Sequence, residues 1–142
     1  MDKKRLSRIL AKCEMEVLNV LVQPVMKKYT IKVLRNPSKT MVLIRMKETV
    51  AKADFYLGEM LACEAMVEVE GVKGFAVMAG DNREKVFHAA IIDAVLKGEL
   101  PEAEEIVTVL EKEEKKQYKR EQMEIRMHEE TKVKFDTLDV NY

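Results

Sequence analysis

Few side chains in this sequence have the type and spacing that common catalytic sites require. No Gly-rich phosphate loop, dinucleotide fingerprint, HExxH zinc motif or GxSxG nucleophile elbow occurs. Cys13 and Cys63 stand alone without CxxC spacing, and His88 and His128 have no other strong metal donor at ligand spacing. We therefore expect no metal site, and we expect the thiols to be the reduced cysteines of a cytoplasmic protein.

The cysteines, histidines and methionines favour structural interpretations over chemical ones. Cys63 lies on the apolar face of an alternating segment with no base nearby in the sequence, so a buried small side chain is favoured over a nucleophile. His88 lies beside an apolar helical stripe and His128 in a charged segment, and for both we favour a surface or hydrogen-bonded histidine. The ten methionines favour core filling over a binding surface.

Glu59 is the first candidate for a catalytic or contact carboxylate. It follows Gly58 directly after an apolar and aromatic run, Phe55-Tyr56-Leu57. This order predicts a carboxylate at a flexible strand end or turn, where a ligand can approach the backbone. An ordinary turn is an equally good interpretation.

A second candidate group lies around Gly80-Asp81-Asn82, which precedes a predicted helix. A strand, a glycine turn and a helix N-terminus ordinarily make an anion site. The charge of Asp81 would repel phosphate, so capping of the helix is favoured, while Gly80 and Asn82 remain candidates for substrate or subunit contact. Asp93 lies beside the apolar stripe of that helix, and we expect its carboxylate to be paired or interfacial.

The elements that position these residues begin with two helical pieces near the N-terminus, the second of which should kink or stop at Pro24. Strands over Tyr29 to Leu34 and Thr40 to Met46 are predicted to form a hairpin around a turn at Asn36-Pro37-Ser38. Because Met41 to Ile44 are apolar on both alternating faces, we expect the second strand to be central or covered on both sides.

A second hairpin is predicted from the clearest strand, Ala62 to Glu70, into Phe75 to Met78, with Gly71 and Gly74 flanking the loop. An amphipathic helix then runs from Arg83 to a stop at Gly98, and its apolar stripe consists of Phe87, Ala90, Ile91, Ala94 and Val95.

The C-terminal third begins with a helix that Pro101 can open and then changes composition. Mixed charges dominate from Glu111 to Glu130, and a solvated helix is favoured there over a partner-binding one. The tail, Lys132 to Tyr142, is expected to be a short strand or an arm that reaches another subunit. We predict an α+β fold with a single domain over residues 1–142: a mainly antiparallel sheet of two hairpins, covered by helices, and a long charged C-terminal helix. Residues 111–142 would form a projecting helix and interaction arm.

Composition excludes some partners. The 25 basic and 25 acidic residues give a formal net charge of zero, so no overall field draws the chain onto nucleic acid or an anionic membrane. No apolar stretch is long enough to span a bilayer, and the N-terminal residues lack the continuous apolar run of a signal peptide. We expect no nucleic-acid partner, no membrane contact and a cytoplasmic location.

A set of residues concentrated between positions 45 and 95 has a distinctive order and spacing: Arg45, Phe55-x-x-Gly58-Glu59, Ala62-Cys63, Gly74, Gly80-Asp81-Asn82, Ala90 and Asp93-Ala94. In these motifs the sequence resembles the PhnG family, the G subunit of the bacterial carbon-phosphorus lyase core complex. The rest of the chain agrees more loosely. Two positions differ from the family's pattern, which has a glycine soon after the position of Arg45 and a basic residue at that of Asp81, so no phosphate contact is expected at Asp81.

The resemblance implies that the chain works in phosphonate metabolism, in a complex with H, I and J subunits. In that complex the J subunit carries the radical iron-sulfur chemistry that cleaves the carbon-phosphorus bond. The G subunit assists an earlier step, together with H, I and an ATPase-like L subunit. In this step an alkylphosphonate displaces adenine from C1′ of MgATP and forms a ribose 1-phosphonate 5-triphosphate. The I subunit is the expected nucleosidase.

The resemblance also implies a transferase subunit that is inactive alone and binds no cofactor by itself, although the complex uses MgATP. The isolated chain could form a homo-oligomer.

Three interpretations of the role stay open. In the first, the chain completes or closes the active site on the I subunit and diverts it from hydrolysis towards phosphonate transfer, with contributions from Glu59 and then Asn82 and Asp93. In the second, it is an independent hydrolase that uses Glu59, Asp93 and His88, which the sequence brings together at no recognised spacing. In the third, it is a structural scaffold without active-site contact.

Overall fold

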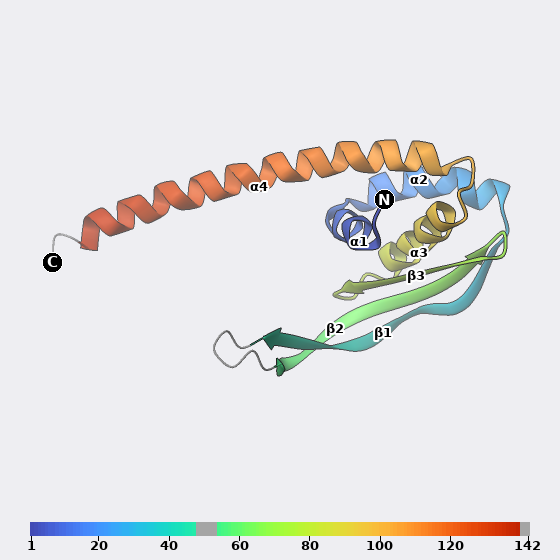
Figure 1. The fold of residues 1–142 in the computed structure, drawn as a ribbon, viewed down its shortest axis with the longest axis horizontal. Helices are drawn as coiled ribbons and strands as arrows, with labels where there is room; N and C mark the ends of the chain where they lie inside the picture. The colour runs from blue at the N-terminus through green and yellow to red at the C-terminus, as the bar shows by residue number, and fades with distance from the viewer. Residues whose placement is uncertain (48–53, 140–142) are drawn as a thin grey trace.

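The computed structural model describes the backbone of residues 1–47 and 54–139 and the side chains of residues 1–43 and 58–129. An antiparallel three-stranded sheet in the order β1-β2-β3 has helices packed against one face (Figure 1). The elements in chain order are α1 (Lys3–Lys12), α2 (Met15–Lys28), β1 (Ile31–Lys47), β2 (Asp54–Val69), β3 (Val72–Ala79), α3 (Arg83–Lys97) and α4 (Ala103–Asp139). The predicted α+β fold, with two consecutive hairpins and a long C-terminal helix, is confirmed.

The two N-terminal helices form where helical spacing of apolar residues predicts them. In α1 the buried side chains are Leu6, Ile9 and Leu10, and α2 buries a similar stripe. The sequence predicts that the second helix kinks or stops at Pro24. It does not stop there, because α2 continues to Lys28. Proline removes the donor that would reach the carbonyl of Val20, but the side chains of Pro24 and Val20 are both exposed on this side of the helix, so water can satisfy that carbonyl.

The predicted turn at Asn36-Pro37-Ser38 is wrong, because these residues lie inside the continuous strand β1. The pairing of β1 with β2 shifts register between Val33 and Arg35 and again between Arg35 and Ser38, which marks β-bulges. Proline is tolerated in a strand at a bulge or on an edge, and β1 has both features. The first hairpin therefore joins β1 to β2 through residues 48–53, which lie outside the described part of the chain.

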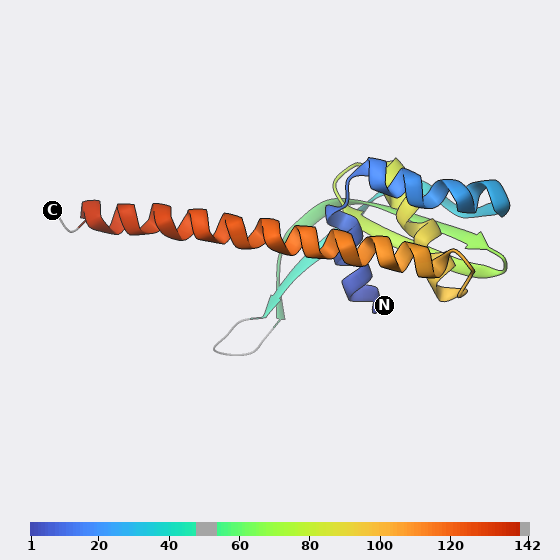
Figure 2. The same cartoon turned by 90° about the horizontal axis from the view of Figure 1, so that it is seen from above.

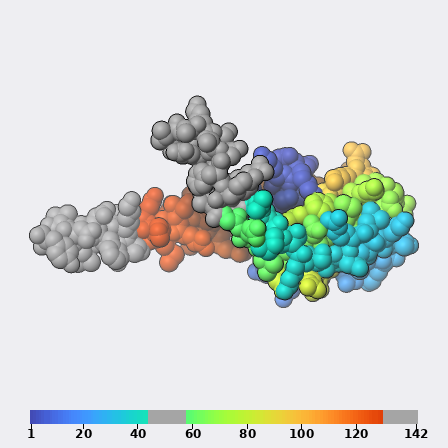
Figure 3. Space-filling model, turned by 90° about the horizontal axis from the view of Figure 1, so that it is seen from below, coloured from blue at the N-terminus to red at the C-terminus, as the bar shows by residue number. Residues whose placement is uncertain are grey.

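The prediction that the strand around Met41 is central or covered on both sides is also wrong. β1 is an edge strand, and the side chains of Met41 and Leu43 are 55% and 52% exposed. Figure 3 looks onto the sheet from the side away from the helices, where β1 lies at the surface. Apolar residues on both faces of a strand indicate burial only when a partner layer is present, and the described part of the chain does not supply one here.

The strand from Ala62 has the predicted alternation, because Cys63, Ala65, Val67 and Val69 form its buried face. The turn after it is shorter than predicted and consists of Glu70-Gly71, both with positive φ (52° and 79°), as a two-residue hairpin requires.

Gly74 does not flank this loop but lies within β3 beneath α3. A Cβ atom there would lie 2.1 Å from the carbonyl oxygen of Ala90, so α3 can lie this close to β3 only because the residue is glycine.

The helix α3 is the centre of the core and not the surface amphipathic helix that the stripe predicts. Residues Val86 and His88 to Val95 are all buried, because the sheet lies on one side and α2 and α4 on the other. Its N-terminus is capped as predicted: the Asn82 side chain accepts a hydrogen bond from the Lys85 backbone N–H at 3.0 Å. The helix ends at Gly98.

The last helix, α4, packs against α1 through residues Glu114 to Glu121 and then extends away from the rest of the molecule (Figures 1 and 2). The prediction of a strand in the tail is wrong, because residues 132–139 continue the helix, while 140–142 lie outside the described part. The role of residues 111–142 as an interaction arm stays a prediction. None of the described helices is long and apolar enough to cross a membrane.

Candidate functional site

The sheet extends beyond its third strand as a two-stranded ribbon. The last pair between β2 and β3 is Ala62 with Ala79, whereas β1 and β2 stay paired as far as Lys47 and Asp54. We call this ribbon, residues 40–47 and 54–61, the hairpin arm. In Figure 1 it runs out below α4, past the end of β3.

Near the base of the hairpin arm, where its side chains are described, both faces carry apolar residues. Met41 lies opposite Leu61, and Val42 lies opposite Met60, so these two pairs occupy opposite faces of the ribbon. Met41, Leu61 and Met60 are exposed by 55%, 42% and 39%. A ribbon of two strands is at best marginally stable in water, and monomers rarely leave apolar patches of this kind uncovered. The hairpin arm therefore has the properties of a contact surface.

Glu59 lies within this surface and not at a strand end or turn, which corrects its predicted position. It is exposed in the middle of β2 and lies opposite Leu43, on the same face as Met41 and Leu61. A carboxylate is thus surrounded by apolar side chains on a face that the described part of the chain leaves open.

Gly58 sits beside an irregularity in the arm. The pairing shifts register between Ile44 and Arg45, whose partners are Gly58 and Tyr56, so Leu57 is the extra residue of a bulge. Gly58 has φ = +154°, which L side chains rarely adopt, and a Cβ there would meet nothing within 4 Å. Backbone geometry, and not lack of space, therefore requires glycine next to Glu59. The side chains of the motif residues Arg45 and Phe55 lie outside the described ones.

The second candidate group lies at the base of the same arm. The Gly80 backbone N–H donates to the carbonyl oxygen of Leu61 at 3.0 Å, which holds the turn Gly80-Asp81-Asn82 near the residues that carry Glu59. Asp81 forms ion pairs with Lys39 (3.3 Å) and Arg83 (3.8 Å). Its charge is therefore already balanced.

Both cysteines are buried thiols, as predicted for Cys63. The Cys63 Sγ lies 3.4 Å from the Gly80 carbonyl oxygen and 3.7 Å from Asp81 Oδ1, and burial, with a further contribution from Asp81, raises its pKa. Burial likewise raises the pKa of Cys13 to about 11. Neither thiol is in a setting that activates a nucleophile.

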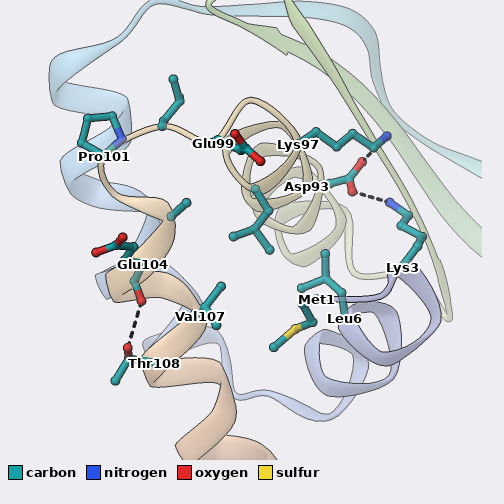
Figure 4. A pocket seen from close by; sticks show the side chains of 13 residues that line it. Met1, Lys3, Leu6, Asp93, Lys97, Glu99, Pro101, Glu104, Val107 and Thr108 are labelled. Atoms are coloured by element: carbon teal, nitrogen blue, oxygen red, sulfur yellow. Dashed lines mark hydrogen bonds and ion pairs between the residues drawn. The ribbon is translucent and has the colours of Figure 1, made fainter.

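Asp93 is paired, as predicted, and lies away from the hairpin arm, where α1, α3 and β3 meet. Its carboxylate is 3% exposed and accepts from Lys3 Nζ (2.8 Å) and Lys97 Nζ (2.9 Å) (Figure 4). It also accepts from the Phe75 backbone N–H at 2.9 Å. Burial alone would raise its pKa, but the bonds from Lys3, Phe75 and Lys97 outweigh burial and lower it. The carboxylate thus fastens α1 and α3 to β3.

A cleft of about 1080 Å³ opens beside Asp93, between α1, α3 and the start of α4 (Figure 4). Its wall combines the apolar side chains of Leu6 and Val107 with the carboxylates of Glu99 and Glu104. Both Asp93 oxygens are already bonded, so the cleft offers no available catalytic pair there.

The structure separates the candidate residues into two places. Phe75, which bonds Asp93, pairs with Met66, and the distance along β2 from Glu59 to Met66 is about 23 Å at about 3.3 Å per residue. Gly58, Glu59, Gly80 and Asn82 gather at the arm, whereas Asp93 lies under the helices. The hydrolase constellation of Glu59, Asp93 and His88 is not assembled.

The sequence matches the family model of phosphonate metabolism protein PhnG over residues 1–139. The chain belongs to the PhnG family. No curated protein matches it. The match includes the hairpin arm and all four helices, so the family assignment covers both places described above and connects them with phosphonate metabolism.

His88 of this PhnG chain differs from its prediction as a surface or hydrogen-bonded histidine. It is 7% exposed, and its Nδ1 atom is the one buried side-chain nitrogen or oxygen without a hydrogen-bond partner among the described residues. Burial lowers its pKa against a smaller opposing effect of Glu84. The reason is the burial of α3 on every side, which an apolar stripe on one side does not reveal. In the described part of the chain, no group of three or more His, Cys, Asp or Glu residues could hold a metal ion.

The exposed surface that the sequence does not predict consists of the described apolar residues of the arm. Core filling is wrong for most methionines, because none of the described methionine side chains is buried and Met41, Met60 and Met123 are exposed, although Met15 and Met78 pack partly against the core. The signal in the sequence is the run of apolar residues on both faces of a strand. Such a run predicts burial within the chain, whereas in this PhnG structure it lies on an open surface.

Proposed function

We propose that this chain is an accessory subunit of the carbon-phosphorus lyase complex. It would assist the displacement of adenine from MgATP by an alkylphosphonate, which forms a ribose 1-phosphonate 5-triphosphate. Membership of the PhnG family supports a role in phosphonate metabolism. The exposed apolar hairpin arm is the observation that carries the proposal of an accessory subunit, because such a surface suits a protein that works in contact with another.

The partner that the arm contacts is proposed to be the I subunit, the expected nucleosidase, in a cytoplasmic complex that also contains H and J and works with L. Displacement at C1′ requires stabilisation of a ribosyl cation-like transition state, protonation of the departing purine and exclusion of water as a competing nucleophile. An apolar ribbon that closes over the active site excludes water. In this proposal MgATP is bound by the complex, and this chain binds no cofactor of its own.

Glu59 is proposed to act where the arm meets the active site. Covering the arm removes its carboxylate from water, which is costly unless a cation or hydrogen-bond donors compensate. A positive charge that develops on the ribose, or a basic side chain of the partner, would provide this compensation. Gly58 lets the backbone bend beside it, Gly80 and Asn82 are proposed contacts at the base of the arm, and Asp93 would contribute by holding the helices in place.

Reconstitution with and without this chain tests the proposal. We expect that omission abolishes phosphonate transfer and leaves hydrolysis of the purine nucleotide by the I subunit. Formation of ribose phosphonate and of free ribose triphosphate would be measured by phosphorus NMR. Unchanged phosphonate transfer without this chain would contradict the proposal.

Glu59→Gln tests the carboxylate itself. We expect turnover to fall by roughly tenfold or more, about 1.4 kcal/mol in transition-state free energy, with the complex still assembled. Glu68→Gln is the matched control, because Glu68 lies on the same strand but on the opposite face. Turnover at the level of the control would exclude a site role for Glu59.

The structural scaffold is the second candidate, because an apolar arm can serve assembly alone. In that case Glu59→Gln would leave turnover unchanged in every assembled complex, or would reduce turnover only in proportion to lost assembly. Co-purification measured alongside turnover separates the two functions.

A further inference from the structure

The charges of α4 are divided between two sides of the helix. The side that faces α1 carries Glu114, Gln117 and Glu121, which recur at the spacing of one helical stripe. Arg5 pairs with Glu114 at 2.6 Å, Lys12 pairs with Glu121, and the Gln117 side chain donates to the carbonyl oxygen of Ile9 at 3.2 Å. The acidic side of α4 is thus matched by the basic residues of α1.

The opposite side of α4 carries a basic stripe, which we define as Lys112, Lys115, Lys119 and Arg126. All four side chains are exposed, and they follow one face of the helix over about 21 Å at about 1.5 Å per residue. No ion pair joins any of them to another residue in the part of the chain that the structure describes. Lys115 and Lys119 are also four residues apart, a like-charge relation that destabilises an isolated helix.

Apolar groups border the basic stripe on both sides. Tyr118 is 62% and Met123 is 65% exposed, and with Lys119, Gln122 and Arg126 they line a shallow groove of about 500 Å³. A free phosphate or a polyphosphate would use the cations but leave both apolar side chains in water. A protein helix with an acidic row beside an apolar one would use all of them.

We propose that the basic stripe of α4 binds an acidic amphipathic helix of a partner protein. Charge complementarity argues for this occupant, and the contact of basic α1 with the acidic side of α4 is the same arrangement with the signs reversed. The stripe lies on the side of α4 away from α1 and continues to where α4 leaves the rest of the molecule, so a helix of about four turns can lie along it (Figure 2). This surface contains neither Glu59 nor the hairpin arm, so the inference goes beyond the proposed function.

The test uses the full-length chain and a designed helical peptide of about 18 residues with a row of Glu beside a row of Leu. Binding of the labelled peptide is measured by fluorescence anisotropy. We expect binding that weakens with added salt. Lys115→Gln, Lys119→Gln and Arg126→Gln combined should weaken binding roughly tenfold. The matched control combines Lys4→Gln, Lys27→Gln and Lys73→Gln, which removes the same charge from exposed positions elsewhere and should bind like the unaltered chain.

Two further measurements separate a helix from a simple anion. Tyr118→Ser, which leaves every charge in place, should weaken peptide binding, and a peptide of the same composition interrupted by prolines should bind at least tenfold more weakly. Inorganic tripolyphosphate and a single-stranded oligonucleotide serve as competitors. The proposal is overturned if either competitor displaces the peptide while Tyr118→Ser binds normally. It is equally overturned if the two triple variants lose affinity alike, or if the chain does not bind the peptide.

Discussion

At the scale of single residues, Asp93 shows what the sequence indicates and what it omits. Its position beside an apolar stripe predicts a paired carboxylate, and the structure confirms the pairing. The partners are not predictable in the same way, because Lys3 and the Phe75 N–H come from other elements and meet Asp93 only when α1 and β3 pack on α3. The surroundings of His88 are unpredictable for the same reason. Its local spacing predicts a surface or hydrogen-bonded side chain, but neighbours distant in sequence bury it.

Asp93→Asn should lower the free energy of unfolding by about 1–2 kcal/mol at pH 7. The amide oxygen can still accept from the Phe75 N–H, but the charge attraction to Lys3 and Lys97 is lost. This loss is moderate, because both lysines are half-exposed and solvent already screens their attraction to Asp93. Asp93→Ala should cost about 2–4 kcal/mol, because that N–H is then left without an acceptor. Urea unfolding monitored by circular dichroism gives both values, and Asp81→Asn, at an exposed aspartate, is the control.

The pH dependence of the Asp93→Asn difference follows from the lowered pKa of Asp93. A carboxyl group with a pKa lower in the folded chain than in the unfolded chain stabilises the fold above its ordinary range, and this stabilisation is lost as the pH falls through the folded pKa. The unaltered chain should therefore approach the stability of Asp93→Asn in acid. A difference that stays constant down to a pH of about 2 would contradict this account.

At the scale of elements, propensity and periodicity predict which segments are helices and strands better than they predict where strands turn. The Asn36-Pro37-Ser38 segment has turn chemistry, yet pairing with β2 on one side carries β1 through it as a bulged strand. The tail around Val133 and Phe135 looks extended in isolation, yet it continues a helix already formed by residues before it. In both cases the neighbouring element decides against the local signal.

Gly74→Ala tests the close contact between α3 and β3. A Cβ atom would lie 2.1 Å from the Ala90 carbonyl oxygen and 2.6 Å from the Ala94 backbone nitrogen, so the helix must move. We expect destabilisation of about 3 kcal/mol or loss of soluble protein. Gly98→Ala is the comparison, because the nearest atom to a Cβ there is a Val72 methyl group at 3.1 Å, which can shift. This substitution should lower the free energy of unfolding by less than about 1 kcal/mol. Equal melting temperatures for the two variants would refute the packing argument.

At the scale of the whole molecule, a formal net charge of zero coexists with strongly different surfaces. The described base of the hairpin arm carries apolar residues on both faces, and between Lys112 and Arg126 α4 is acidic towards α1 and carries the basic stripe on the opposite side. Overall composition predicts the absence of a long-range electrostatic field, but it does not predict these different surfaces. The charged surfaces of α4 arise because α1 covers one side of it, and the apolar surface of the arm arises because the helix layer ends before the sheet does. The sequence singles out Gly58, Glu59, Gly80 and Asn82 as candidates, whereas it does not reveal that they lie together at one exposed end of the sheet while Asp93 lies under the helices.

The isolated chain should self-associate through its hairpin arm, because no helix covers Met41, Leu43 or Leu61 in the described structure. Met41→Ser with Leu43→Ser should reduce this association and prevent co-purification with the I subunit, while changing the free energy of unfolding by less than about 1 kcal/mol, since both side chains are already exposed. Sedimentation velocity and urea unfolding measure the two effects. Val33→Ser, at a 42% exposed position of β1 outside the arm, is the control.

Salt distinguishes the two surfaces within one molecule. Association through the apolar arm should persist or strengthen as salt is added, because it depends on burial of apolar area. Binding of the acidic helix to the basic stripe should weaken over the same range, because exposed charges are screened. If self-association instead disappears with salt and survives the double substitution in the arm, the arm is not the apolar contact surface, and charged residues must provide the contact.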